Sequence, residues 1–224
     1  MGALVLCVCG VSVRTGAVDL LRRGWDGRKY RRRGDAGTSR SPNRRKTSIV
    51  QRVAIVSGPG AGKTTFARAV GLPHVELDAM WWEPGWRQAP LDVFQTRVRE
   101  VVDGDAWVIE GFYVEEAGIP IVWPRADTLV WLDLPRWRCV PRAVRRSLGQ
   151  VVSRVELWNG NRQRASVLTP RSVWRLWRRW PSYPATIEWA LATRDWSHLN
   201  LVRLRSEADV RRFLEKRYQS ATNS

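Results

Sequence analysis

A chain of 224 residues with 44% hydrophobic residues is long enough for one domain with a real core and too short for two large ones. Its net charge of +17 attracts phosphate groups of any kind, in nucleic acid, in a nucleotide or at a membrane surface. No apolar run is long enough to cross a bilayer, so we expect a cytoplasmic protein without a membrane partner. The three cysteines and two histidines lack metal-ligand spacing, so we expect neither a disulfide framework nor a metal-ligand cluster.

The chain divides near residue 49. Residues 1–48 hold 12 Lys/Arg against 3 Asp/Glu with almost no periodic apolar pattern, which predicts a basic, disordered extension. This extension is either a nucleic-acid arm that uses Arg31, Arg32 and Arg33 or a solvated tail. Residues 49–224 are predicted to form the folded domain, in which residues 150–169 have little periodicity and predict a mobile lid insert.

Segments of β-branched residues alternate with amphipathic ones from Gln51 onward. Strands are predicted over residues 53–57, 74–77, 107–111, 128–133 and 199–205. Helices are predicted over residues 63–70 and 90–102, from 136 towards 148, at two positions entered at 169–170 and near 182, and from Ser206, where Asp209 completes a capping box. This alternation indicates an α/β sandwich with a mainly parallel, five-stranded sheet.

The most specific motif follows the first strand. It departs from the G-x-x-x-x-G-K-[ST] pattern of a P-loop only at its first residue, Ser57. Its glycines allow backbone N–H groups to converge on an anion, Lys63 is expected to reach the β and γ phosphates of ATP, and Thr64 to offer its hydroxyl to Mg²⁺. The predicted phosphate-binding residues are Ser57, Gly58, Pro59, Gly60, Ala61, Gly62, Lys63, Thr64 and Thr65.

Three carboxylates at strand ends are candidates for the chemistry. Glu110 and Asp133 are alternative partners for Mg²⁺, and either could instead cap the next helix. Asp78 could accept a proton from an attacking hydroxyl, hold Mg²⁺ or serve as a helix N-cap. The tryptophans that follow it form either an aromatic wall for an acceptor or part of the core: Trp81, Trp82 and Trp86.

Arginines of the second half are candidates for stabilising a transferring phosphoryl group. Arg142, Arg145 and Arg146 share one predicted helix and suit a phosphate clamp, and Arg154, Arg162 and Arg164 of the insert could close over the nucleotide. Because arginine is abundant throughout the chain, a solvated surface position is the favoured alternative for any single one of them. Trp174 and Trp177 alternate with arginines at helical spacing, which suits either base stacking or core packing.

Five segments together resemble the adenylate-kinase-like P-loop proteins often labelled DNA topology modulation proteins. They are SGPGAGKTT, LDAMWWEPGW, WVIEGFY, LVWLDLPRWRC and LWNGNRQ, within residues 52–215. The resemblance implies that strand 107–111 lies beside the P-loop strand, which favours Glu110 over Asp133 for Mg²⁺. It also implies that Asp78 and its tryptophans line the acceptor side and that the arginines after 140 form the lid.

Two departures from the pattern bear on function. Phe112-Tyr113 lacks the proline of adenylate kinases proper, so AMP is not assumed as acceptor, and Pro141 is expected to kink the helix that carries Arg145 and Arg146. The sequence therefore predicts an ATP- and Mg²⁺-dependent, nucleotide-kinase-like phosphotransferase acting on a small-molecule acceptor. The alternative is an ATP-binding regulatory protein that engages DNA or RNA through its basic surface without phosphotransfer.

Overall fold

The computed structural model describes the backbone of residues 51–222 and the side chains of residues 51–215. The expectations for residues 1–48 therefore lie outside the described residues. Five parallel strands form one sheet, as predicted, and their order is β2-β5-β1-β6-β7. The strands are β1 (Arg52–Val56), β2 (His74–Glu76), β5 (Trp107–Glu110), β6 (Thr128–Leu132) and β7 (Asn200–Leu204).

The three middle strands of the sheet are almost entirely buried. β5 and β6 are buried at every residue, and β1 is buried at all but its first. Continuous apolar runs of this kind are expected where helices cover both faces of a parallel sheet. The register aligns Ile55 of β1 with Glu110 of β5, so the neighbour expected for the P-loop strand is confirmed.

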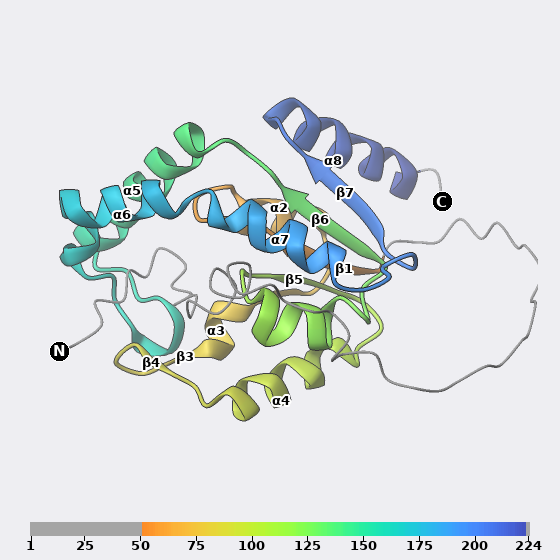
Figure 1. The fold of residues 1–224 in the computed structure, drawn as a ribbon, viewed down its shortest axis with the longest axis horizontal. Coiled ribbons are helices and arrows are strands. Elements are labelled where there is room, and N and C mark those ends of the chain that lie inside the picture. Colours follow the sequence, from red (N-terminus) through yellow and green to blue (C-terminus); the bar gives the residue numbers. More distant parts are fainter. Residues whose placement is uncertain (1–50, 223–224) are drawn as a thin grey trace, which may run out of the picture.

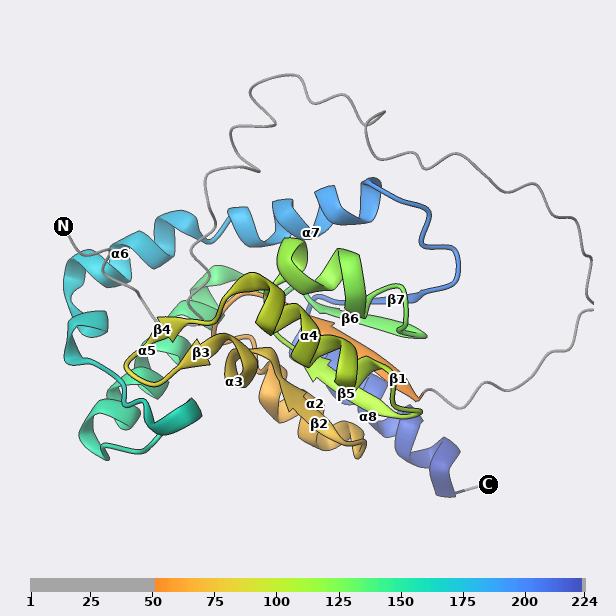
Figure 2. The same cartoon turned by 90° about the horizontal axis from the view of Figure 1, so that it is seen from below.

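Helices cover both faces of this sheet. Figures 1 and 2 show α4, the π-helix η2 and α7 on one face, and α2 and α8 on the other, which confirms the three-layer α/β sandwich. Helices α5 and α6 extend beyond one end of the sheet (Figure 1). Their bounds are α2 (Lys63–Val70), α4 (Leu91–Val102), η2 (Val114–Val122), α5 (Arg136–Val152), α6 (Pro170–Arg179), α7 (Ser182–Ala192) and α8 (Glu207–Thr222).

Helix ends agree closely with the sequence signals. Thr169 accepts a hydrogen bond from the backbone N–H of Ser172 at the start of α6. Before α8, the Asp209 N–H donates to the Ser206 hydroxyl at 3.1 Å and the Ser206 N–H donates to Asp209 at 2.9 Å, so the predicted capping box is confirmed. The helix α5 runs over 17 residues with Pro141 inside it, which agrees with the helix predicted from residue 136 towards 148.

The structure contains elements that periodicity did not indicate. A short helix, α3 (Leu77–Trp81), follows β2 directly, and the hairpin of β3 (Trp82–Glu83) and β4 (Arg87–Gln88) follows α3. The hairpin turns at Gly85 and Trp86, both with positive φ. The π-helix η2 is confirmed by the i to i−5 hydrogen bond from the Trp123 N–H to the Gly118 carbonyl.

No helix within residues 51–222 has the length and apolar character that a membrane crossing requires.

Candidate functional site

The loop between β1 and α2 has the backbone of an anion cradle. Gly60 and Gly62 have φ values of 75° and 90°, a left-handed region that glycine adopts without strain. Gly62 caps α2 without a side-chain hydrogen bond, so the first N–H groups of the helix face the loop. Lys63 is buried, and its ammonium donates to the Ser57 and Gly58 carbonyls at 3.2 and 3.3 Å. N–H groups, a helix start and a cation therefore converge as an anion requires.

Neighbouring elements hold this loop in place. The Ser57 hydroxyl donates to the Leu132 carbonyl at the end of β6 at 2.7 Å, which gives the residue that replaces the first P-loop glycine a structural role. A Cβ at Gly58 would lie 2.9 Å from the Trp180 ring, and a Cβ at Gly60 would lie 2.2 Å from the Cys139 carbonyl of α5. The loop is therefore packed so closely that these positions admit no side chain without movement.

Glu110 and Asp133 have different surroundings. Glu110 is buried at the end of β5, where the Thr64 hydroxyl bonds to it. Burial raises the pKa of Glu110, and the Lys63 charge and the Thr64 hydrogen bond oppose this rise. Asp133 instead forms an ion pair with Arg203 of β7 at 2.8 Å and does not line the pocket at the loop. The geometry thus places Glu110, and not Asp133, beside the predicted Mg²⁺ ligand Thr64.

Asp78 lies in the first turn of α3 and does not act as its N-cap, a position held by Glu76. The Tyr113 hydroxyl donates to Asp78 at 2.6 Å, within the buried interior. Burial raises the pKa of Asp78, while the Tyr113 hydrogen bond and the Lys63 charge act in the opposite direction. A carboxylate held in this way, at the edge of a phosphate-binding loop, suits proton transfer.

These groups meet in one pocket with a volume of about 890 Å³. It is lined by the P-loop from Gly60 to Thr65 and by the carboxylates Glu76, Asp78 and Glu110. Arg142, Arg145 and Arg146 of α5 and Trp158 of the insert also line it. The volume falls within the range typical of small-molecule sites.

The predicted clamp and lid arginines separate into two groups. Arg142, Arg145 and Arg146 line the pocket, and Arg142 is also ion-paired with Glu207 of α8. The insert arginines Arg154, Arg162 and Arg164 do not line it.

The insert is anchored to the segment after β2. It contains the short 3₁₀ helices η3 (Trp158–Gly160) and η4 (Ala165–Leu168). The Asn159 side-chain amide donates to the Ala79 and Trp82 carbonyls at 3.0 and 2.5 Å, and the Trp158 indole N–H donates to Glu76 at 2.8 Å. These bonds give the segment, which we expected to be mobile, specific partners between Glu76 and Trp82.

The aromatic residues named from the sequence lie mostly inside the protein. Trp82 is fully buried, Trp81 packs against Phe94 with ring centroids 4.9 Å apart, and Trp86 contacts Trp82 at 5.5 Å. They do not line the pocket, so the structure gives them a packing role. On α6, Trp177 is partly buried with the Arg136 guanidinium 4.5 Å from its ring, whereas Trp174 is 60% exposed.

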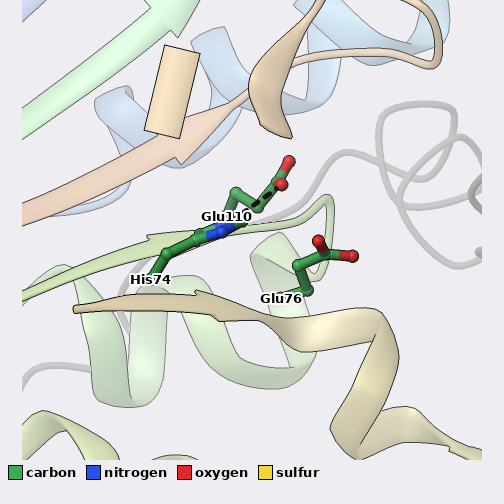
Figure 3. A group of neighbouring side chains, drawn as sticks. All are labelled: His74, Glu76 and Glu110. Carbon is green, nitrogen blue, oxygen red and sulfur yellow. Dashed lines mark hydrogen bonds and ion pairs between the residues drawn. The ribbon is translucent and has the colours of Figure 1, made fainter. Parts of the chain in front are cut away.

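Sequence reasoning missed four side chains at this site: His74, Glu76, Tyr113 and Trp158. Figure 3 shows His74 and Glu76 on β2 beside Glu110 on β5. Their period-2 spacing in the predicted strand 74–77, next to a strand that ends in Glu110, was a usable signal. The contacts made by Tyr113 and Trp158 join positions 35 and 82 residues apart in sequence, for which the chain offers no local signal.

The sheet order, the loop after β1 and the helix that follows it define an α/β P-loop domain. No family model matches the chain, and no curated protein matches it. Among solved structures, a shikimate kinase from Acinetobacter baumannii in complex with shikimate has a TM-score of 0.45 and 16% identity, covering 78% of this chain and 94% of that one. A shikimate kinase from Bacteroides thetaiotaomicron has a TM-score of 0.43 and 15% identity, covering 79% of this chain and 100% of that one. Likenesses this distant do not bear on what this chain acts on.

Proposed function

We propose that this protein is an ATP- and Mg²⁺-dependent phosphotransferase that acts on a small-molecule acceptor. The observation that carries the proposal is the single pocket in which the P-loop, two buried carboxylates and three arginines converge. An NTP-binding loop alone would not require Asp78, a second buried carboxylate that lines the same pocket as Glu110. Phosphoryl transfer requires positioning and charge stabilisation, and this set of residues supplies both.

The residues present fit ATP and Mg²⁺. The left-handed backbone at Gly60 and Gly62 and the ammonium of Lys63 suit the β and γ phosphates. The Thr64 hydroxyl and the Glu110 carboxylate are the hard oxygen ligands, or outer partners, that Mg²⁺ prefers. The metal would neutralise phosphate charge during transfer. Arg145 and Arg146 would face the same charge from α5.

Asp78 would serve the acceptor. In the reaction, the acceptor hydroxyl oxygen forms the new bond to the γ-phosphorus, the bond to the β-γ bridging oxygen breaks, and the hydroxyl proton passes to Asp78. The pKa of Asp78 is raised by burial, which makes its carboxylate a better proton acceptor than a solvated one. Tyr113 fixes its orientation through the 2.6 Å hydrogen bond.

The test is ADP release from ATP and Mg²⁺, with and without a panel of nucleoside monophosphates, nucleosides and small hydroxylated metabolites. Lys63→Ala provides the blank, and Asp133→Asn is the matched carboxylate control because Asp133 does not line the pocket. We expect acceptor-dependent ADP release that is lost in Lys63→Ala and Asp78→Asn and kept in Asp133→Asn. ATP binding without any acceptor that raises turnover above the blank would contradict the proposal.

One observation favours a second function, an ATP-binding protein that engages DNA or RNA. Trp137 and Trp174 are 59% and 60% exposed, and the Arg138 guanidinium lies 4.8 Å from the Trp137 ring. Exposed aromatic rings among arginines can stack on bases. Binding of a fluorescent oligonucleotide should then weaken steeply between low and physiological salt and weaken further in Trp174→Ala. Phosphotransfer, in contrast, should be much less sensitive to salt than oligonucleotide binding is.

A further inference from the structure

The ends of β2 and β5 bring an imidazole and two carboxylates together in a way that the phosphotransfer reaction does not require. The register pairs Glu76 of β2 with Glu110 of β5, and His74 lies two residues before Glu76 on the same face of the strand. One ligand atom from each of the three side chains lies within 4.8 Å of the others. Figure 3 shows the three side chains side by side, with the imidazole directed at the Glu110 carboxylate.

We propose that His74, Glu76 and Glu110 form a binding site for a divalent transition-metal ion of the Mn²⁺, Co²⁺ and Zn²⁺ type, held by the protein without nucleotide. A site meant only for Mg²⁺ would be built from oxygen ligands. An imidazole nitrogen shifts the preference towards ions that bind nitrogen ligands, and the two carboxylates allow Mn²⁺ to bind as well.

The distances agree with a shared ion. His74 Nε2 and Glu110 Oε1 are 3.1 Å apart. Two ligands bound to one such ion at about 2.0–2.2 Å, at roughly a right angle, are about 3 Å from each other. The pair therefore has the spacing of neighbouring ligands without further movement.

The charges around the site favour a cation. Glu76 and Glu110 are like charges on adjacent strands, and Glu110 is only 5% exposed. Two carboxylates drawn together in a partly buried place repel each other, and a bound cation would relieve this repulsion further than the nearby charge of Lys63 does. The Trp158 indole N–H donates to Glu76 Oε2 at 2.8 Å, as outer hydrogen-bond donors do when they orient a metal-binding carboxylate.

This site lies next to the proposed nucleotide site and shares Glu110 with it. Thr64 also bonds to Glu110, so an ion at His74 would lie beside the phosphates without being carried in by them. Metal binding at this site does not depend on phosphotransfer and can be measured when neither ATP nor an acceptor is present.

The experiment is a titration of the full-length, untagged, metal-free protein with Co²⁺, followed by visible absorption and by calorimetry, then competition with Zn²⁺ and with Mg²⁺. We expect one equivalent of Co²⁺ to bind without nucleotide, with d–d bands from nitrogen and oxygen ligands and no sulfur charge-transfer band. Zn²⁺ should displace Co²⁺, whereas Mg²⁺ at the same concentration should not. A sulfur charge-transfer band would place the ion on a cysteine and overturn the proposal.

Variants separate a ligand from a hydrogen-bond partner. His74→Ala should weaken Co²⁺ binding by at least tenfold, since even the loss of an outer partner costs about 10–100-fold. The matched control is His198→Ala, which removes the only other histidine, one whose ring nitrogen lies 3.2 Å from the Trp123 carbonyl. Equal Co²⁺ affinity in both variants would show that His74 only hydrogen-bonds to Glu110, and the proposal would fall.

A measurement on the unaltered protein covers the case in which His74→Ala does not fold. Mn²⁺ bound without nucleotide should show a ¹⁴N coupling from imidazole in pulsed electron paramagnetic resonance. Bound Mn²⁺ without a nitrogen coupling, or no Mn²⁺ binding at all, would refute the assignment. Either result would leave the ADP-release assay unaffected, so a failure here is distinct from a failure of the proposed phosphotransferase.

Discussion

Two glycines of the P-loop share a left-handed backbone but differ in their neighbours, which allows a sharp prediction about stability. A Cβ at Gly60 would lie 2.2 Å from the Cys139 carbonyl and 2.9 Å from the Ala143 nitrogen, both in the backbone of α5. A Cβ at Gly62 would meet nothing within 4 Å. Alanine at either position has to adopt positive φ, but only Gly60→Ala also has to push the loop away from a helix.

The magnitudes follow from these two causes. The left-handed conformation costs an L-residue roughly 1–2 kcal/mol, so Gly62→Ala should lower the free energy of unfolding by about that amount. Overpacking adds about 1–3 kcal/mol where the neighbours are backbone and cannot rotate away. Gly60→Ala should therefore lose roughly 2–5 kcal/mol in total, which is a large part of the stability of an ordinary domain.

Urea unfolding followed by circular dichroism and tryptophan fluorescence would measure the difference between the two variants. The slopes with urea have to agree for the comparison to be valid. Because Gly60 contacts α5, the arginines of that helix should move with the loop, so ATP affinity should also fall more in Gly60→Ala. If the two variants lost the same stability within about 0.5 kcal/mol, the close packing of the loop on α5 would not hold.

Three further predictions concern the same site. Asp78→Asn should lower kcat by about 10²–10⁴-fold. The same variant should also change the pH dependence of stability. Because burial raises the Asp78 pKa, the stability that this carboxyl contributes to the wild type at acid pH is lost as pH rises through that pKa. The stability of the variant relative to wild type should therefore grow from acid to neutral pH in thermal unfolding, and a difference that stays constant with pH would contradict this cause. Ser57→Ala should cost about 1–3 kcal/mol of unfolding free energy, because the buried Leu132 carbonyl loses its donor, and a chemical denaturation curve that matches wild type would rule that out. Asn159→Ala removes two hydrogen bonds between the insert and the segment after β2, so hydrogen exchange in the insert should accelerate while the core strands stay protected; unchanged exchange would mean that these bonds do not anchor it.

Much of the fold was predictable because local signals and tertiary packing agree. The three middle strands are buried, largely apolar runs of the right length, and the helix Lys63–Val70 was predicted with its observed bounds. The capping box at Ser206 and Asp209 is a local pattern that needs no tertiary partner, and it formed as expected. The helix α5 was predicted to continue across Pro141, and it does, although proline removes one backbone hydrogen bond there.

The phosphate loop could be placed from sequence alone, since its chemistry depends on consecutive residues. Glycine spacing, a lysine and a hydroxyl in fixed order are enough to specify an anion cradle wherever a strand leads into a helix. The choice between Glu110 and Asp133 was different. Both end apolar strands, and the hydrophobic pattern alone does not separate them. The resemblance favoured Glu110, and the structure places Glu110 in the pocket and pairs Asp133 with Arg203 outside it.

The amino-acid sequence by itself therefore determined the class of fold, the phosphate-binding loop and the candidates for the chemistry, because these depend on spacing along the chain. The tertiary structure alone decided which candidates share a pocket. It joined Tyr113 to Asp78 and Trp158 to Glu76, and it brought His74 alongside Glu110. Contacts between residues 35 to 82 positions apart depend on strand order and helix packing, for which a short stretch of sequence carries no signal.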